Sequence, residues 1–147
     1  MYIKYHIIIG AIASIILYLL FPITIIQAVI IFLASFLIDL DHFGPYYKET
    51  RNLNPKKATE YYIDSEKEWI KMNKHERKTY LHFLIIFHGF EFWIILLVLA
   101  FFFPIFYFIL LGIAIHMVLD YIDMIKLKYP FYCKFSQVYV YLKNKKK

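Results

Sequence analysis

The chain has 147 residues, a length typical of one domain, and 61% of them are hydrophobic. Soluble domains contain about 45–50% apolar residues, so the composition indicates a membrane protein and counts against a soluble enzyme. The net charge is +6, but the basic residues lie in segments beside the apolar runs. That placement indicates a bilayer surface rather than nucleic acid. A single cysteine, Cys133, excludes a framework of intrachain disulfides and a thiolate metal cluster.

Two long apolar tracts dominate the chain. The first would form a helix about 50 Å long at ~1.5 Å per residue, against a hydrocarbon core of about 30 Å, so it has to turn. Phe21-Pro22 interrupts the first tract and Phe103-Pro104 the second, and proline breaks a helix. The predicted fold class is therefore all-α: a polytopic membrane protein with four transmembrane helices in two helical hairpins, forming a single integral membrane domain over 1–147. The predicted spans are about 5–21, 23–40, 81–103 and 105–125.

The segment 43–80 joins the two predicted hairpins and is polar. We expect a turn at His42-Phe43-Gly44-Pro45, because glycine and proline favour turns. Asn54-Pro55 has the pattern of a helix cap followed by proline at the first helical position. An amphipathic cytoplasmic helix is predicted from there to about residue 73, on the membrane surface or over a site. One apolar stripe of this helix contains Ala58, Tyr62, Trp69 and Met72.

The basic residues predict the orientation of the chain. All 17 Lys and Arg flank the same ends of the predicted spans: Lys4, nine in segment 43–80 and seven in the basic tail 126–147. The positive-inside rule then places both termini and the 43–80 segment in the cytoplasm. We expect a multi-pass protein of the cell's inner membrane, with the lipid bilayer as its partner, an interfacial tail and no nucleic acid.

Ionisable side chains inside membrane spans are costly and usually functional. In the predicted arrangement they all fall in the cytoplasmic half of the bundle. Residues three or four apart share one face of a helix, which is how bundle helices present paired ligands to a common metal centre. Such pairs are Asp39 with His42, His88 with Glu91, and His116 with Asp120; His6, Asp41, His82 and Asp123 lie at similar depth.

Imidazole and carboxylate groups without thiolate suit a divalent metal, with zinc favoured and manganese or iron as alternatives. A cation would also compensate buried carboxylates, and the set is large enough for two metals. Direct links between helices without metal are the alternative, although Lys and Arg are absent from the span interiors. The predicted metal ligands are His6, Asp39, His42, His88, Glu91, His116 and Asp120, with Asp41 or Asp123 as the catalytic base.

Three motifs together resemble a known family. His6 is followed by Asp39-Leu40-Asp41-His42 at the end of the second span and by Gly112-Ile113-Ala114-Ile115-His116-Met117-Val118-Leu119-Asp120 in the fourth. This order resembles the inner-membrane metal-dependent hydrolase family described as LexA-binding, over nearly the whole chain. The resemblance implies a membrane-embedded hydrolase that uses these residues around metal.

The family's third motif, His-Arg-Gly-x-x-His-Ser, is altered in this chain. If His82 is its second histidine, Arg77 stands in place of the first. The other candidate is His88 in Phe87-His88-Gly89-Phe90-Glu91. We favour His88 and Glu91, because they share a helix face and lie deeper in the predicted span.

The sequence therefore predicts a membrane-embedded metal-dependent hydrolase acting on an ester or phosphoester, such as a lipid, at the cytoplasmic face. One alternative is a small transporter of metal ions or protons. The polar residues stop halfway across the bilayer, which counts against a complete path. A second alternative is a membrane scaffold without catalytic activity, whose basic tail binds anionic lipid or a partner.

Overall fold

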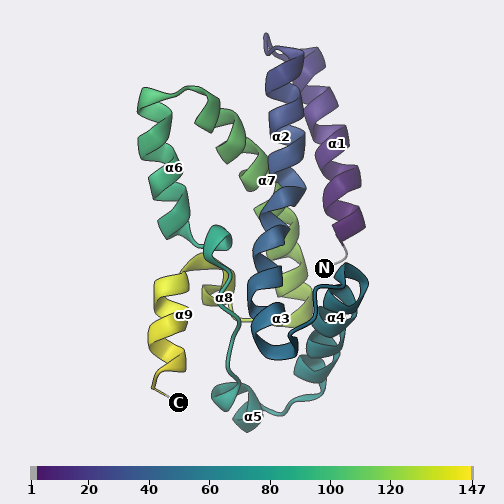
Figure 1. Ribbon diagram of the computed structural model, residues 1–147, viewed down its shortest axis with the longest axis vertical. Coiled ribbons are helices and arrows are strands. Elements are labelled where there is room, and N and C mark those ends of the chain that lie inside the picture. The colour runs from purple at the N-terminus through teal and green to yellow at the C-terminus, as the bar shows by residue number, and fades with distance from the viewer. Residues whose placement is uncertain (1–2, 147) are drawn as a thin grey trace.

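The computed structural model describes residues 3–146, and every regular element in that range is a helix (Figure 1). Four apolar helices form two hairpins, α1 with α2 and α6 with α7, as the sequence predicts. Helix α2 packs against both α1 and α7, and α6 packs against α7. The bounds are α1 Ile3–Leu20, α2 Ile25–Leu37, α6 Phe90–Phe102 and α7 Ile105–Leu127.

Both hairpin turns fall at the predicted prolines. Helix α1 ends just before Pro22, and Pro104 directly precedes α7. Thr24 caps α2: its hydroxyl accepts from the Gln27 amide at 3.3 Å, and the Gln27 side chain accepts from the Thr24 amide at 2.8 Å. This reciprocal cap supplies partners to amides that the first helical turn leaves free.

Three helical stretches in residues 3–146 are long and apolar enough to cross a membrane: Ile3–Leu20, Ile25–Thr50 and Ile105–Leu127. The fourth, α6, is apolar but has 13 residues. The predicted third span was too long, because helix begins only at Phe90. Residues 81–89 are irregular except for one 3-10 turn, η2 (Ile86–His88).

The predicted turn at residues 42–45 is wrong. Helix α2 continues through a 3-10 segment, η1 (Ile38–His42), directly into α3 (Phe43–Thr50). Gly44 and Pro45 fall in the first turn of α3, and the first turn is where an α-helix tolerates proline. The chain reverses instead at Arg51, which has a left-handed backbone with φ of 54°.

The amphipathic helix is confirmed as α4 (Pro55–Lys71), with Asn54 as its cap. Its buried face crosses the ends of the apolar helices. Trp69 donates its indole N–H to the Leu127 carbonyl at 3.1 Å, and the Tyr62 hydroxyl donates to the His42 carbonyl at 2.6 Å. A short helix, α5 (Lys74–Thr79), follows.

The tail is folded rather than merely interfacial. It forms α8 (Tyr132–Phe135) and α9 (Gln137–Asn144), which lie below α6 in Figure 1. Glu91 fixes this unit, because its carboxylate accepts from the Ser136 hydroxyl at 2.5 Å and from the amides of Gln137 and Val138 at 3.2 Å. Negative charge at a helix N-terminus is favourable, so Glu91 anchors α9 to α6.

Candidate metal centre

Seven of the predicted residues meet where the irregular segment 81–89 and α8 pack against the long helices. His6 comes from the first turns of α1, His88 from η2, and His116 and Asp120 from α7. Segment η1 supplies the rest. With about three residues per turn, a 3-10 helix eclipses positions three apart, so η1 turns Asp39 and His42 the same way. The gathered set is His6, Asp39, Asp41, His42, His88, His116 and Asp120.

Four donor atoms form the middle of this cluster. The Nε2 atoms of His88 and His116 are 3.1 Å apart, and Asp120 Oδ2 lies 3.4 Å and 3.1 Å from them. Asp39 Oδ1 lies 3.7 Å from the His88 nitrogen and 3.5 Å from the His116 nitrogen. Both histidines are fully buried, and Asp120 is 2% exposed. These three donors therefore lie away from bulk water, and Asp39, 18% exposed, is the donor nearest the surface.

Outer hydrogen bonds fix both imidazole rings. His116 Nδ1 lies 3.0 Å from the Ser35 carbonyl oxygen, which can only accept, so Nδ1 carries the proton. His88 Nδ1 donates to Asp41 Oδ2 at 3.2 Å in the same way. In the neutral rings, both Nε2 lone pairs then point into the cluster. Such carboxylate or carbonyl partners are the usual outer support of metal-binding histidines.

The spacing of the four donors fits a metal ion. Ligands about 2.0–2.2 Å from a tetrahedral cation lie about 3.3–3.6 Å from one another. The five measured separations run from 3.1 to 3.7 Å. Facing lone pairs repel unless protons or a cation lie among them, and a divalent ion satisfies all four at once. These buried groups could hold a metal ion of the class that binds nitrogen and oxygen donors.

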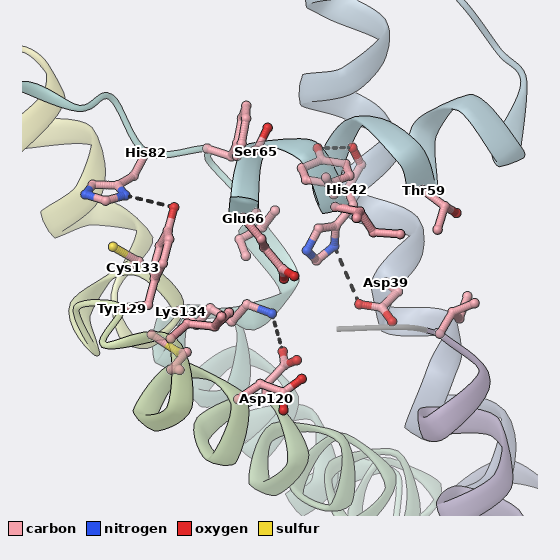
Figure 2. A pocket seen from close by; sticks show the side chains of 18 of the residues that line it. Asp39, His42, Thr59, Ser65, Glu66, His82, Asp120, Tyr129, Cys133 and Lys134 are labelled. Carbon is pink, nitrogen blue, oxygen red and sulfur yellow. Dashed lines mark hydrogen bonds and ion pairs between the residues drawn. The ribbon is translucent and has the colours of Figure 1, made fainter. Parts of the chain in front are cut away.

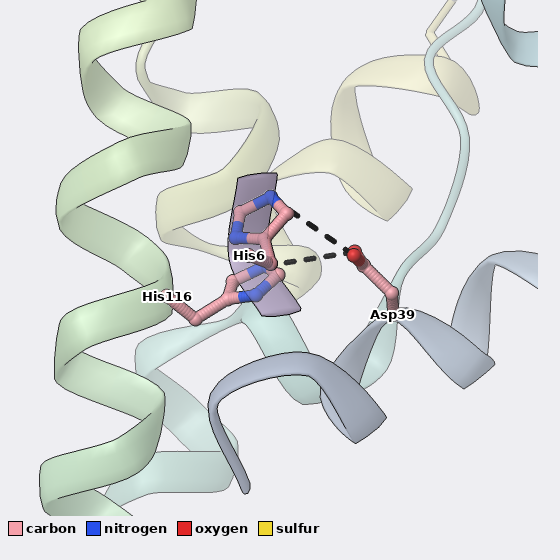
Figure 3. Close-up of side chains that lie close together, drawn as sticks. All are labelled: His6, Asp39 and His116. Carbon is pink, nitrogen blue, oxygen red and sulfur yellow. Dashed lines mark ion pairs between the residues drawn. The ribbon is translucent and has the colours of Figure 1, made fainter. Parts of the chain in front are cut away.

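A second group of donors adjoins the first (Figure 3). His6 stacks on His116 with ring centroids 3.8 Å apart, and its Nε2 lies 3.5 Å from Asp120 Oδ1 and 4.0 Å from Asp39 Oδ2. These are the carboxylate oxygens that the central four do not use. The Nδ1 atom of His6 is buried and has no hydrogen-bond partner. Asp39 and Asp120 could thus each present one oxygen to either of two positions.

His42 and Asp41 form the side of the cluster nearest α4. His42 Nδ1 lies 3.1 Å from Asp41 Oδ1 and 3.6 Å from Asp39 Oδ1. Asp41 also accepts the Phe87 amide at 2.8 Å through the oxygen that contacts His88. Both oxygens of Asp41 are therefore engaged by protein groups.

The structure does not bring Glu91 to this cluster. The spacing of His88 and Glu91 predicts that they share one helix face, but the helix begins only after His88, and the Glu91 carboxylate binds the start of α9. Asp123 lies one turn beyond Asp120, lines the adjacent cavity and contacts Lys126 at 3.5 Å. His82 also lines that cavity, but it is held by the hydroxyls of Tyr129 at 3.4 Å and Tyr132 at 3.2 Å.

Sequence reasoning missed Lys134. Its ammonium Nζ donates to Asp120 Oδ2 at 2.6 Å, from α8 in the tail (Figure 2). The tail was expected to lie at the membrane surface, so none of its residues was considered for the site. One signal was available, because Lys134 is the single charged residue in the aromatic stretch 129–142.

Comparison with known proteins agrees with these motifs. The family model of the YdjM inner membrane protein matches residues 1–144, which is almost the entire chain. Searches of curated proteins and of solved structures give no match. The family is of the LexA-regulated inner-membrane type that the motifs resemble, so that resemblance is confirmed. The chain belongs to the YdjM inner membrane protein family.

Proposed function

We propose that this protein is a membrane-embedded, metal-dependent hydrolase that cleaves an ester or phosphoester at the cytoplasmic face. The observation that carries the proposal is the four-donor group at the centre, where His88, His116, Asp39 and Asp120 face one another at metal-ligand spacing. Their chemistry favours zinc, with manganese or iron as alternatives. His6 and His42 would complete the centre.

A divalent cation bound by these residues would polarise the substrate's ester group and acidify a water molecule. In the reaction, water adds its oxygen to the acyl carbon or the phosphorus, and the bond from that atom to the ester oxygen breaks. One proton of the water goes to a base, and the leaving oxygen takes up a proton to become an alcohol.

The side chains around the centre divide this work. We assign the base to Asp123, because it lines the cavity and its carboxylate is 25% exposed with only a 3.5 Å contact to Lys126. Asp41 is better suited to positioning, since its two oxygens already hold His42, His88 and the Phe87 amide. Ser35 is also a positioning residue, because its backbone carbonyl oxygen accepts from His116 Nδ1 and orients that ring.

The location of the centre favours a hydrolase over a transporter. The gathered ionisable groups lie toward one end of the helix bundle. The opposite halves of α1, α2, α6 and α7 contain no Asp, Glu, Lys, Arg or His. A transport path needs polar groups across the whole membrane, whereas a hydrolytic site does not.

Metal analysis of the purified protein tests the proposal. We expect one or two zinc ions per chain in the wild type and loss of zinc in a double variant, His116→Ala with Asp120→Ala. His75→Ala is the matched control, because His75 is exposed on α5. Hydrolysis of chromogenic esters and phosphoesters should fall with a chelator and return with zinc. Wild-type protein without stoichiometric metal, or a double variant that keeps its full metal content, would refute the proposal.

A further inference from the structure

One cationic side chain reaches the metal centre from outside the bundle helices. Lys134 projects from α8, and its ammonium nitrogen lies 2.6 Å from Asp120 Oδ2 (Figure 2). Its side chain is 20% exposed whereas Asp120 is 2% exposed, so Lys134 stands between the buried donors and open space. A lysine side chain ordinarily carries an ammonium group at neutral pH, and here that group is paired with the Asp120 carboxylate.

The open space beside Lys134 is a cavity of about 170 Å³. The cavity lies between α4 and the centre, and its lining combines apolar side chains such as Ile63, Phe83 and Leu127 with groups of the centre itself. Among the described residues that line it, Lys134 is the only lysine or arginine. A molecule entering this cavity would meet Asp39, Asp120 and the ammonium together.

Asp120 Oδ2 links the ammonium to the predicted cation position. This oxygen is one of the four central donors and also the acceptor of the Lys134 hydrogen bond. A cation held by the donors at about 2.0–2.2 Å would lie within about 5 Å of Nζ. Two positive charges at that separation repel. Asp120 Oδ2 lies between the two charges and offsets part of the repulsion. A second anionic group in contact with both charges would still be attracted to the pair more strongly than a neutral ester.

We propose that Lys134 binds a nonbridging oxygen of a phosphoester, so that the substrate of this site is a phosphoester and not a carboxylic ester. The inference rests on the proposed function, because it uses the same metal centre. A phosphoester carries permanent negative charge that spreads further over its oxygens as the bond breaks, and Lys and Arg are the usual side chains that stabilise it. Lys134 would act as a substrate-binding residue beside the cation.

Hydrogen bonds hold Lys134 in place for this role. The Gln137 side chain donates to the Cys133 carbonyl at 2.9 Å and accepts the Ile85 amide at 2.9 Å. The residue before Lys134 is thereby tied to the segment that carries His88. The tail thus presents the ammonium from a fixed element rather than from a loose chain end.

Phosphate binding tests the inference without relying on turnover. Zinc-loaded protein in detergent is titrated with inorganic phosphate by calorimetry. We expect Lys134→Met to weaken phosphate binding at least tenfold with unchanged zinc content, and Lys134→Arg to stay within threefold of the wild type. Lys145→Met is the control, because Lys145 is exposed at the end of α9. Lys134→Met protein that binds phosphate as tightly as the wild type at equal zinc content overturns the inference.

A measurement on the wild type covers the case in which Lys134→Met does not fold. Acetylation of individual lysines by acetic anhydride is followed by mass spectrometry with and without inorganic phosphate. Phosphate should slow the acetylation of Lys134 at least fivefold and leave Lys145 unchanged. Equal rates at Lys134 with bound phosphate overturn the inference.

Competition experiments distinguish a lipid from a free phosphoester. Glycerol 3-phosphate and dioctanoyl phosphatidate in mixed micelles have the same type of phosphate group, and each is used to displace bound phosphate. Displacement by the lipid at much lower concentration supports a lipid phosphoester, and equal displacement supports a soluble one. Displacement by neither contradicts the inference. Wild-type protein that binds no zinc refutes the proposed function itself, so the two failures are separable.

Discussion

Gly112 provides the sharpest test of how the centre is held together. Helix α7 approaches α2 at this glycine. A Cβ atom added at Gly112 would lie 2.7 Å from the Ala34 Cβ and closer still to the Ile31 carbonyl oxygen. The same two helices carry the ligands, because Asp39 follows α2 directly and His116 lies one turn beyond Gly112 on α7. The variant Gly112→Ala adds this Cβ atom between the two helices.

The expected magnitude follows from these distances. Ordinary contact begins at 3.4 Å, so the Ala34 contact alone requires the helices to move apart by about 0.7 Å. The Ile31 carbonyl oxygen lies closer and requires more, and a backbone oxygen cannot rotate out of the way. Overpacking of this kind costs about 1–3 kcal/mol. Replacing glycine by alanine in a helix otherwise stabilises by about 0.4–1 kcal/mol. The difference is a net loss of up to about 2.5 kcal/mol, with a midpoint of about 1.3 kcal/mol.

Thermal unfolding in detergent and zinc affinity by chelator competition measure the outcome. Gly44→Ala is the matched control, because a Cβ at Gly44 would meet nothing within 4 Å. We expect Gly112→Ala to melt below the wild type and bind zinc about 10-fold or more weakly, since a site tolerates only about 0.5 Å of displacement. Gly44→Ala should be neutral or slightly stabilising. Equal stability and zinc affinity in the two variants would refute the reasoning.

Two further variants separate anchoring from ligation. Asp41→Asn removes the negative charge that accepts the Nδ1–H of His88. Loss of such outer support should weaken zinc binding about 10–100-fold in chelator competition. A zinc affinity within twofold of the wild type would contradict this role. Glu91→Gln should leave zinc bound but speed amide hydrogen exchange at the start of α9 about 10-fold or more, because hydrogen bonds to a charged acceptor contribute about 1.5–3 kcal/mol. Loss of zinc from the Glu91→Gln variant would instead indicate that Glu91 is a metal ligand.

The fold was largely predictable because hydrophobic runs and prolines carry strong information. The breaks at Pro22 and Pro104 and the cap at Asn54 all lie where the sequence indicates. The predicted turn at Gly44-Pro45 failed because proline also suits a first helical turn and glycine can adopt helical as well as turn backbone angles. The predicted third span was too long because most of residues 81–89 are apolar although they do not form an α-helix. Hydrophobicity alone does not show where a helix begins.

Helix periodicity explains which residues of the candidate site could be paired from sequence. His116 and Asp120 lie on one regular helix, and the structure brings them to 3.1 Å. Asp39 and His42 lie three positions apart on η1, a 3-10 segment, and the structure brings them to 3.6 Å. The positions of Glu91 and Lys134 could not be predicted, because both depend on the tail folding back onto α6. That contact joins segments far apart in the sequence, and no local sequence pattern indicates it.

Asp120 joins the beginning and the end of the chain. One of its carboxylate oxygens faces His6 at 3.5 Å, and the other receives Lys134 at 2.6 Å. These partners come from α1 and α8, which are far apart in the sequence. During synthesis the pocket therefore stays unfinished until α8 has left the ribosome. Only a chain translated through α8 can offer a complete site to a cation and its substrate.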